Sequence, residues 1–190
     1  MNGREAGSPL EAVRLRTPLS ESAARELRAG TKVLIDGVVY GARDAAHKRL
    51  CEMFARGEDA PIPLRDQLIY YVGPAPAKPG HPIGPAGPTT SGRMDAYTIP
   101  LLERGVRGFI GKGYRSGEVR AALIRFGAVY FGTIGGAAAL LARRIVASRV
   151  VAFADLGTEA IYELEFDAFP AFVVNDVLGG SGYVEVNPGA

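Results

Sequence analysis

The residue types best suited to chemistry gather in residues 84–95, which read Gly-Pro-Ala-Gly-Pro-Thr-Thr-Ser-Gly-Arg-Met-Asp. Proline fixes its own φ, and glycine permits tight turns and close approach to a ligand, so this composition favours a shaped loop over a flexible tether. The three hydroxyls of residues 89–91 offer hydrogen-bond donors or a proton-transfer group, and Arg93 offers a guanidinium group that binds carboxylate or phosphate. We therefore interpret this segment as part of an anion pocket.

Two further cations, Arg43 and Lys112, stand at comparable positions. Arg43 and Arg93 each lie near the predicted start of a helix, where the helix dipole disfavours a positive charge by up to about 1 kcal/mol. A bound carboxylate or phosphate would explain them, because amide N–H groups and guanidinium groups converge on the same oxygens. Lys112 lies between two glycines after a predicted strand. For each cation alone a surface ion pair is the simpler interpretation, such as Arg43 with Asp44 or Glu52, but for the three together we favour a shared anion site.

Other candidates are weaker. One of the hydroxyls at 89–91 is expected to cap the following helix. His47 lies one turn after Arg43, where it could face the same site, and one turn before Cys51, but two ligands make a poor metal site, and we interpret Cys51 as a packed side chain. Gly-Lys-Gly at 111–113 completes neither a Walker sequence nor G-x-G-x-x-G, so binding of ATP or a dinucleotide is not predicted.

The composition describes a chain that can bury a proper core. Of 190 residues, 47% are hydrophobic and 22% charged, and the formal net charge of +2 gives no broad basic surface for nucleic acid. We expect a single domain over residues 1–190. The single cysteine fits a reducing compartment. No apolar run is long enough to span a bilayer, and residues 1–9 lack the apolar segment of a signal peptide, so a cytoplasmic location without a membrane partner is expected.

The elements that must position these residues follow from hydrophobic periodicity and turn signals. In the first half we expect, in order, a strand at 12–17, a helix at 21–28 capped by Ser20, a β-hairpin over 32–40 that turns at Asp36-Gly37, a helix at 42–55 and a strand at 67–72. After residue 94 a short helix is expected, which Pro100 permits only if the helix begins near or after it or kinks there.

The second half has an α/β rhythm. Strands are expected at 108–110 and 129–133, helices at 118–126 and 137–145, and further strands at 150–153, 160–166 and 171–174. The glycine-rich loops at 111–113 and 135–136 follow strands, and the carboxyl ends of strands are where α/β sheets usually bind ligands. This pattern predicts an α/β fold with its site at that edge.

Four ordered motifs give the chain a family resemblance. Residues 41–49 read Gly-Ala-Arg-Asp-Ala-Ala-His-Lys-Arg, residues 84–95 carry Gly-Pro and Gly-Pro-Thr-Thr-Ser-Gly-Arg-Met-Asp, residues 111–113 read Gly-Lys-Gly and residues 174–176 read Val-Asn-Asp. Over roughly residues 15–183 the chain resembles the β subunit of class I iron-sulfur hydro-lyases, the class I fumarate hydratases and L(+)-tartrate dehydratases. The resemblance implies a swivelling β/β/α three-layer domain with a mixed sheet.

The resemblance also implies roles for the motif residues. Thr89 resembles the proposed base that moves the C3 proton of the hydroxy acid, and Arg43, Arg93 and Lys112 resemble the residues that bind the substrate carboxylates. The implied reaction is reversible addition of water to a dicarboxylic alkene. In that family a [4Fe-4S] cluster, held by three cysteines of the α portion, acts as the Lewis acid. With a single cysteine this chain cannot ligate the cluster, so a cluster-bearing α subunit in a hetero-oligomer is the predicted partner.

Three functions stay open at this point. Fumarate hydration leads, L(+)-tartrate dehydration is its close neighbour, and a non-catalytic dicarboxylate-binding module belongs to a different class. The presence of Thr89, Arg93, Arg43 and Lys112 together counts against the binding module, because a relative that had lost catalysis should have lost some of them.

Overall fold

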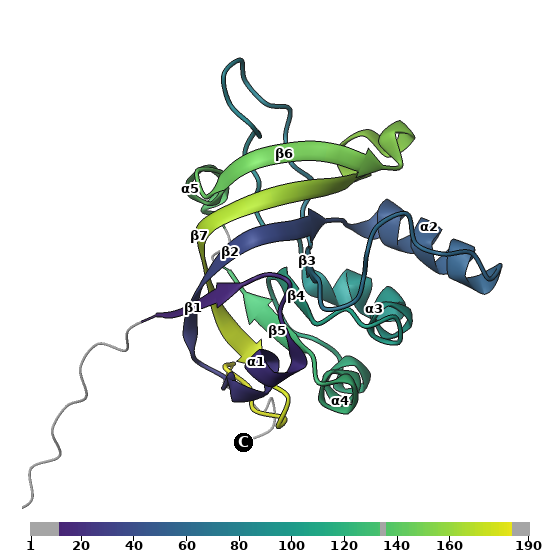
Figure 1. The fold of residues 1–190 in the computed structure, drawn as a ribbon, viewed down its shortest axis with the longest axis vertical. Helices are drawn as coiled ribbons and strands as arrows, with labels where there is room; N and C mark the ends of the chain where they lie inside the picture. The colour runs from purple at the N-terminus through teal and green to yellow at the C-terminus, as the bar shows by residue number, and fades with distance from the viewer. Residues whose placement is uncertain (1–11, 134–135, 184–190) are drawn as a thin grey trace, which may run out of the picture.

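The computed structural model describes residues 12–133 and 136–183, which form a mixed α/β fold with seven strands (Figure 1). The α-helices and strands are β1 (Val13–Arg16), α1 (Glu21–Glu26), β2 (Lys32–Gly41), α2 (Asp44–Ala55), β3 (Leu68–Tyr70), α3 (Asp95–Leu102), β4 (Gly108–Gly111), α4 (Gly117–Phe126), β5 (Val129–Gly132), α5 (Ala138–Ala142), β6 (Ile145–Ala152) and β7 (Ile161–Asn175). Two 3-10 helices, η1 (Ser91–Met94) and η2 (Ala154–Glu159), complete the fold. None of the helices in these two ranges has the length and apolar character needed to cross a bilayer.

The sheet closes on itself. Its strand order is β1-β2-β3-β4-β5-β7-β6, and an additional pairing of β2 with β7 joins β2, β3, β4, β5 and β7 into a small barrel. Strands β1 to β5 pair in parallel, whereas β7 runs antiparallel to β2, β5 and β6. Parallel strands end at the same edge, so the segments that follow β2, β3, β4 and β5 emerge together.

Both faces of the central strands are buried, which explains why they are apolar throughout. Tyr70 and Ile110 point into the barrel, whereas Ile69, Tyr71 and Phe109 belong to a second core on the helix side. Helices α2, α3 and α4 lie in a row on one side of the sheet (Figure 1). All residues of β3, β4 and β5 are buried. A strand that is covered on both faces consists of a continuous run of apolar residues. Such runs allowed β3, β4 and β5 to be predicted from the sequence.

Two predictions about strands are wrong. The expected hairpin over 32–40 is the single strand β2, whose pairing register with β7 shifts between Ile35 and Gly37. Gly37 has φ +95°, and a Cβ there would lie 2.7 Å from Oγ1 of Thr17, so the Asp-Gly pair marks a bulge rather than a turn. Likewise the two strands expected at 160–166 and 171–174 are the single strand β7, which continues through Ala168 at φ +48°.

Most helix predictions are confirmed within a few residues. Ser20 caps α1, since its Oγ accepts a hydrogen bond from the N–H of Ala23 at 3.2 Å. The segment 84–95 leads, as expected, into a helix start, first η1 and then α3. A helix start near or after Pro100 is wrong, however, because α3 begins at Asp95 and contains the proline, which cannot donate a backbone hydrogen bond.

Candidate active site

The carboxyl edge of the parallel strands gathers the predicted site residues. Arg43 follows β2 by two residues and Lys112 comes directly after β4. Thr90 forms a parallel β-bridge with Lys112, and the N–H of Ser91 donates to the carbonyl of Lys112 at 2.9 Å. The segment that begins at Thr89 therefore lies against the loop after β4, although the two are more than twenty residues apart in sequence.

Thr89 is placed by the return of the long glycine-proline loop. Val72 and Pro88 form an antiparallel bridge, and the N–H of Thr89 donates to the carbonyl of Tyr71 at 2.7 Å. The loop of residues 73–87 is thus closed at its base, and its far part projects beyond β6 (Figure 1). Thr89 itself is half-buried at the end of β3.

Arg43 and Arg93 meet on one carboxylate. Asp44, the first residue of α2, accepts from Nε and Nη2 of Arg93 at 3.0 Å each and from Nε of Arg43 at 3.2 Å. Nε of Arg43 also lies 2.7 Å from Oε1 of Glu159 in η2. Desolvation raises the pKa of Asp44, but the hydrogen bond and positive charge of Arg93, a backbone hydrogen bond and the hydrogen bond from Arg43 together leave this pKa below its usual value. Of the two ion pairs considered from the sequence, Arg43 forms the one with Asp44, whereas Glu52 pairs with Lys48.

The hydroxyls do not cap the helix as expected. Thr90 is the N-cap of η1 but makes no side-chain cap bond, and the N-cap of α3 is Met94. Ser91 is buried, and its Oγ is bonded to the hydroxyl of Tyr130 at 2.8 Å. A Cβ on Gly111 would overlap the Ser91 hydroxyl and lie 2.9 Å from Cδ2 of Tyr71, so only glycine allows this close approach.

A buried arginine that the sequence analysis did not single out, Arg115, connects the start of α3 to the loop after β4. Arg115 has a side chain that is 0% exposed, and its Nε lies 2.7 Å from Oδ1 of Asp95. Its other nitrogens donate to Oγ1 of Thr98 at 2.5 Å and to the Tyr71 hydroxyl at 3.1 Å. The second oxygen of Asp95 accepts from the N–H of Ser116 at 2.7 Å. This network fixes the start of α3 to the loop after β4. No local sequence pattern indicates this network, because Arg115 belongs to none of the four motifs and its partners lie on other elements.

His47 belongs to the core rather than to the site. It is fully buried, its Nδ1 is bonded to the carbonyl of Arg43 at 2.9 Å, and its ring packs edge-on against Tyr71 with 5.4 Å between centroids. Its Nε2 has no hydrogen-bond partner among the described residues. Burial lowers the pKa of His47 from 6.5 to about 4, against the opposing effect of the hydrogen bond to Arg43. The imidazole is therefore neutral at physiological pH.

The described residues do not offer a metal centre. In the two described ranges no three His, Cys, Asp or Glu side chains gather as potential metal ligands. Cys51 is half-buried, and burial raises the pKa of its thiol, which disfavours the thiolate that would ligate iron. These residues therefore do not fit a [4Fe-4S] cluster.

The Val-Asn-Asp motif has a structural task. One carboxylate oxygen of Asp176 accepts from the N–H groups of Leu178 and Gly180 at 2.9 and 2.8 Å, and the other accepts from the N–H of Ala29 at 2.9 Å. Desolvation raises the pKa of Asp176, but these backbone bonds together keep it below its usual value. The motif thus holds the turn after β7 against the segment between α1 and β2.

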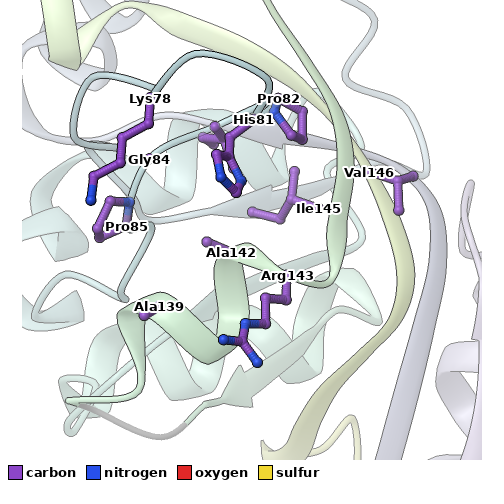
Figure 2. A pocket seen from close by; sticks show the side chains of 11 residues that line it. Lys78, His81, Pro82, Gly84, Pro85, Ala139, Ala142, Arg143, Ile145 and Val146 are labelled. Carbon is purple, nitrogen blue, oxygen red and sulfur yellow. The ribbon is translucent and has the colours of Figure 1, made fainter.

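A cavity of about 600 Å³ lies between the glycine-proline loop and α5 (Figure 2). Figure 2 shows Lys78 and His81 coming from the loop, and Ala142 and Arg143 from the α5 side. The lining includes none of the four predicted site residues. The cavity therefore lies apart from the residues that the sequence predicts for the site.

Comparison with known proteins identifies relatives over nearly the whole chain. Residues 2–186 match the model of the family described as Fumarase C-terminus. The chain is 38% identical over 190 residues to "Fumarate hydratase class I, anaerobic" of Escherichia coli, which covers 96% of this chain and 34% of that protein. It is 41% identical over 157 residues to "Fumarate hydratase 2" of Leishmania major, which covers 81% of this chain and 28% of that protein. The chain thus spans about a third of the length of these relatives.

A third relative has a similar length. The chain is 35% identical over 175 residues to "Putative L(+)-tartrate dehydratase subunit beta" of Methanocaldococcus jannaschii, with 89% of this chain and 90% of that protein covered. This relative, which the chain matches over nearly its whole length, is thus named as one subunit of a dehydratase.

Proposed function

Because the chain belongs to the Fumarase C-terminus family, we propose that it is the β portion of an iron-sulfur hydro-lyase that reversibly hydrates fumarate to malate. The relatives named fumarate hydratase are about three times longer than the matched segment, so the remaining machinery belongs to another part, the α portion. In this proposal the chain is a swivelling domain that closes its carboxyl edge onto that part in a hetero-oligomer.

The observation that supports this proposal is that the segments bearing three cations and a threonine lie at one edge of the sheet. Arg43 and Arg93 share the carboxylate of Asp44, and Lys112 lies beside the segment that follows Thr89. Guanidinium groups bind carboxylates in bidentate fashion, and two such groups with an ammonium match the two carboxylates of a four-carbon diacid.

Each residue has a distinct task in the proposed reaction. Arg93 and Arg43 bind and orient the substrate carboxylates, and Lys112 supplies further positive charge. Thr89 moves the proton at C3, which requires nearby positive charge because an aliphatic hydroxyl is a poor base at neutral pH. The proposal assigns this charge to Lys112, whose backbone is bridged to that of Thr90.

The cluster belongs to the partner in this proposal. Cys51 is the chain's single cysteine, and the described residues offer no set of metal ligands, so the three cluster cysteines are assigned to the α subunit. When bound there, the [4Fe-4S] cluster supplies Lewis acidity to the substrate.

L(+)-tartrate dehydration is the second candidate. The similarity in length to a protein named as the β subunit of a putative L(+)-tartrate dehydratase favours it, since that relative is matched over 90% of its length. Fumarate and tartrate are both four-carbon dicarboxylates, so the same three cations serve either.

Co-expression of the chain with its cluster-bearing partner under anaerobic conditions, followed by assays on malate and tartrate, tests the proposal. We expect turnover of malate to fumarate by the pair and none by the isolated chain. Turnover of tartrate without turnover of malate would refute fumarate hydration and support L(+)-tartrate dehydration. Turnover of neither substrate, with an intact cluster, would leave a dicarboxylate-binding module.

Two variants separate the proposed roles. Arg93→Ala should raise KM by about tenfold or more, because a charge-assisted hydrogen bond contributes about 1.5–3 kcal/mol. Thr89→Ala should lower kcat by about 10² or more with little change in KM, as expected when a proton-transfer group is lost. The control is Arg49→Ala, which removes a half-buried arginine paired with Asp155 outside the candidate site. Equal effects of both site variants on kcat and KM would contradict the assignment.

A further inference from the structure

Asp44 is the point at which two segments of the candidate site are joined. It begins α2, directly after Arg43, while Arg93 arrives from η1, 49 residues further along the chain. Both carboxylate oxygens take part, since Oδ1 accepts from Nε of Arg93 and Oδ2 accepts from Nη2 of Arg93 and Nε of Arg43. One side chain therefore contacts two guanidinium groups, and Glu159 also holds Arg43 through Nε at 2.7 Å.

The bonding leaves the outer parts of both guanidinium groups for a ligand. Arg93 is 51% exposed and Arg43 is 30% exposed, so each side chain reaches solvent. Within residues 12–133 and 136–183, Nη1 of Arg93 and both Nη atoms of Arg43 have no acceptor bonded to them. Asp44 thus occupies the Nε side of each arginine and leaves Nη atoms of each guanidinium group without a bonded acceptor among the described residues.

Two considerations indicate that this arrangement serves ligand binding. Two arginine side chains placed close together repel each other, and a shared carboxylate offsets that repulsion. An exposed arginine also loses side-chain rotamer freedom when it binds a ligand, and a side chain that is already held loses less. Both effects lower the free-energy cost of binding an anion at this edge.

We propose that Asp44 is a positioning residue that holds Arg43 and Arg93 in the orientation that receives a substrate carboxylate. This inference rests on the proposed function, because it takes the ligand to be a dicarboxylate. Asp44 touches neither substrate nor reacting atoms, and it acts through the two arginines.

The opposite role for Asp44 makes the opposite prediction. If its carboxylate occupied the place of the substrate carboxylate and had to be displaced, removal of its charge would strengthen dicarboxylate binding. If Asp44 positions the arginines, its removal weakens binding. The sign of the change in KM therefore distinguishes the two roles.

The first measurement is independent of activity. In NMR spectra of the full chain, the Nε–Hε signals of Arg43 and Arg93 should be protected from exchange and shifted from the position of a free arginine. Asp44→Asn should return the Arg93 signal to that position and shift the Arg43 signal less, because Nε of Arg43 keeps Glu159 as an acceptor at 2.7 Å. The matched control is Asp155→Asn, which removes a carboxylate that accepts from Nη1 and Nη2 of Arg49 at 2.8 Å each and should leave the Arg43 and Arg93 signals unchanged. Asp44→Ser serves as a second variant in case Asp44→Asn does not fold.

The second measurement uses fumarate as the probe with the anaerobic, cluster-loaded complex. Asp44→Asn should raise KM for fumarate by about tenfold with a smaller change in kcat, while Asp155→Asn leaves both unchanged. Altered NMR signals with an unchanged or lower KM would overturn the positioning role, as would unaltered NMR signals. The wild-type complex could fail to hydrate fumarate while the NMR signals respond as expected. That result would refute the proposed function and the role of Asp44 in substrate binding. It would leave the ion pairs of Asp44 confirmed.

Discussion

Acidification tests the burial of His47. Its pKa is lowered from 6.5 to about 4, first because the ring is buried, and a nearby Arg115 adds to the effect. In the folded protein the imidazole is neutral at pH 5, whereas in the unfolded chain it is largely protonated. Unfolding therefore takes up a proton between about pH 6.5 and pH 4, and the free energy of unfolding falls as the pH is lowered through this window.

The size of the effect follows from the pKa difference. A lowering from 6.5 to about 4, at about 1.4 kcal/mol per pH unit, gives a loss of about 3 kcal/mol between pH 7 and pH 4. For a domain whose total stability is roughly 5–15 kcal/mol, such a loss is large. Carboxylates with lowered pKa values, such as those of Asp44 and Asp176, add to the acid sensitivity in the same direction.

The assay is urea denaturation at several pH values between 4 and 7, with His47→Asn as the variant. The asparagine amide can still donate to the carbonyl of Arg43, so the variant keeps the hydrogen bond and removes the titrating group. It should be less stable at pH 7 because its smaller side chain leaves a cavity, but its stability should depend less steeply on pH. His81→Asn, at an exposed loop position, is the control and should retain the wild-type slope.

The test compares how steeply the free energy of unfolding changes with pH in the wild type and in His47→Asn. The carboxylates contribute equally to this slope in both proteins, so a difference between the slopes reports on His47. If His47→Asn loses as much stability as the wild type between pH 7 and pH 4, His47 does not take up a proton on unfolding in this window. The ring would then be solvated or paired in the folded state, and the inferred burial would be refuted.

Two further predictions concern the scaffold of the site. Asp95→Ala leaves the buried Arg115 without its carboxylate and should lower the free energy of unfolding by about 3–5 kcal/mol, measured by urea denaturation. Gly111→Ala should cost about 1–3 kcal/mol because its Cβ would overlap the Ser91 hydroxyl, whereas Gly117→Ala, with open space around it in the first turn of α4, should be neutral or slightly stabilising by thermal denaturation. Equal effects of the two glycine substitutions would contradict the close approach at Gly111.

The parts of the site that follow from local rules were predictable. Arg43 and Lys112 each stand at the end of a strand, and Arg93 stands at the start of a helix, as glycine and proline signals indicated. Their gathering at one edge follows from parallel strands, which all end on the same side. The catalytic and binding roles of these residues, with Thr89 as the base, stay predictions.

The partners within the site were not predictable in the same way. Asp44 was expected at most as a surface partner of Arg43, yet it also binds Arg93 from a segment 49 residues away. Arg115 was not singled out, because its burial depends on Asp95 and Tyr71, which reach it from the elements after β3. Such contacts arise from how elements pack, and no local pattern encodes them.

The sequence by itself determined the α/β class, most helices and strands, and the placing of three candidate cations at element ends, because hydrophobic period, turn residues and charge at element ends are local properties. Thr89 was singled out among three hydroxyls by the family resemblance. Only the tertiary structure decided that Asp36-Gly37 is a bulge, since an Asp-Gly pair suits both a hairpin turn and a bulge, and the choice depends on β1 and β7 pairing along β2. It likewise decided the closure of the sheet into a barrel and the sharing of Asp44 by two arginines. These features depend on long-range pairing, in which the free energy comes from contacts between segments and not from either segment alone.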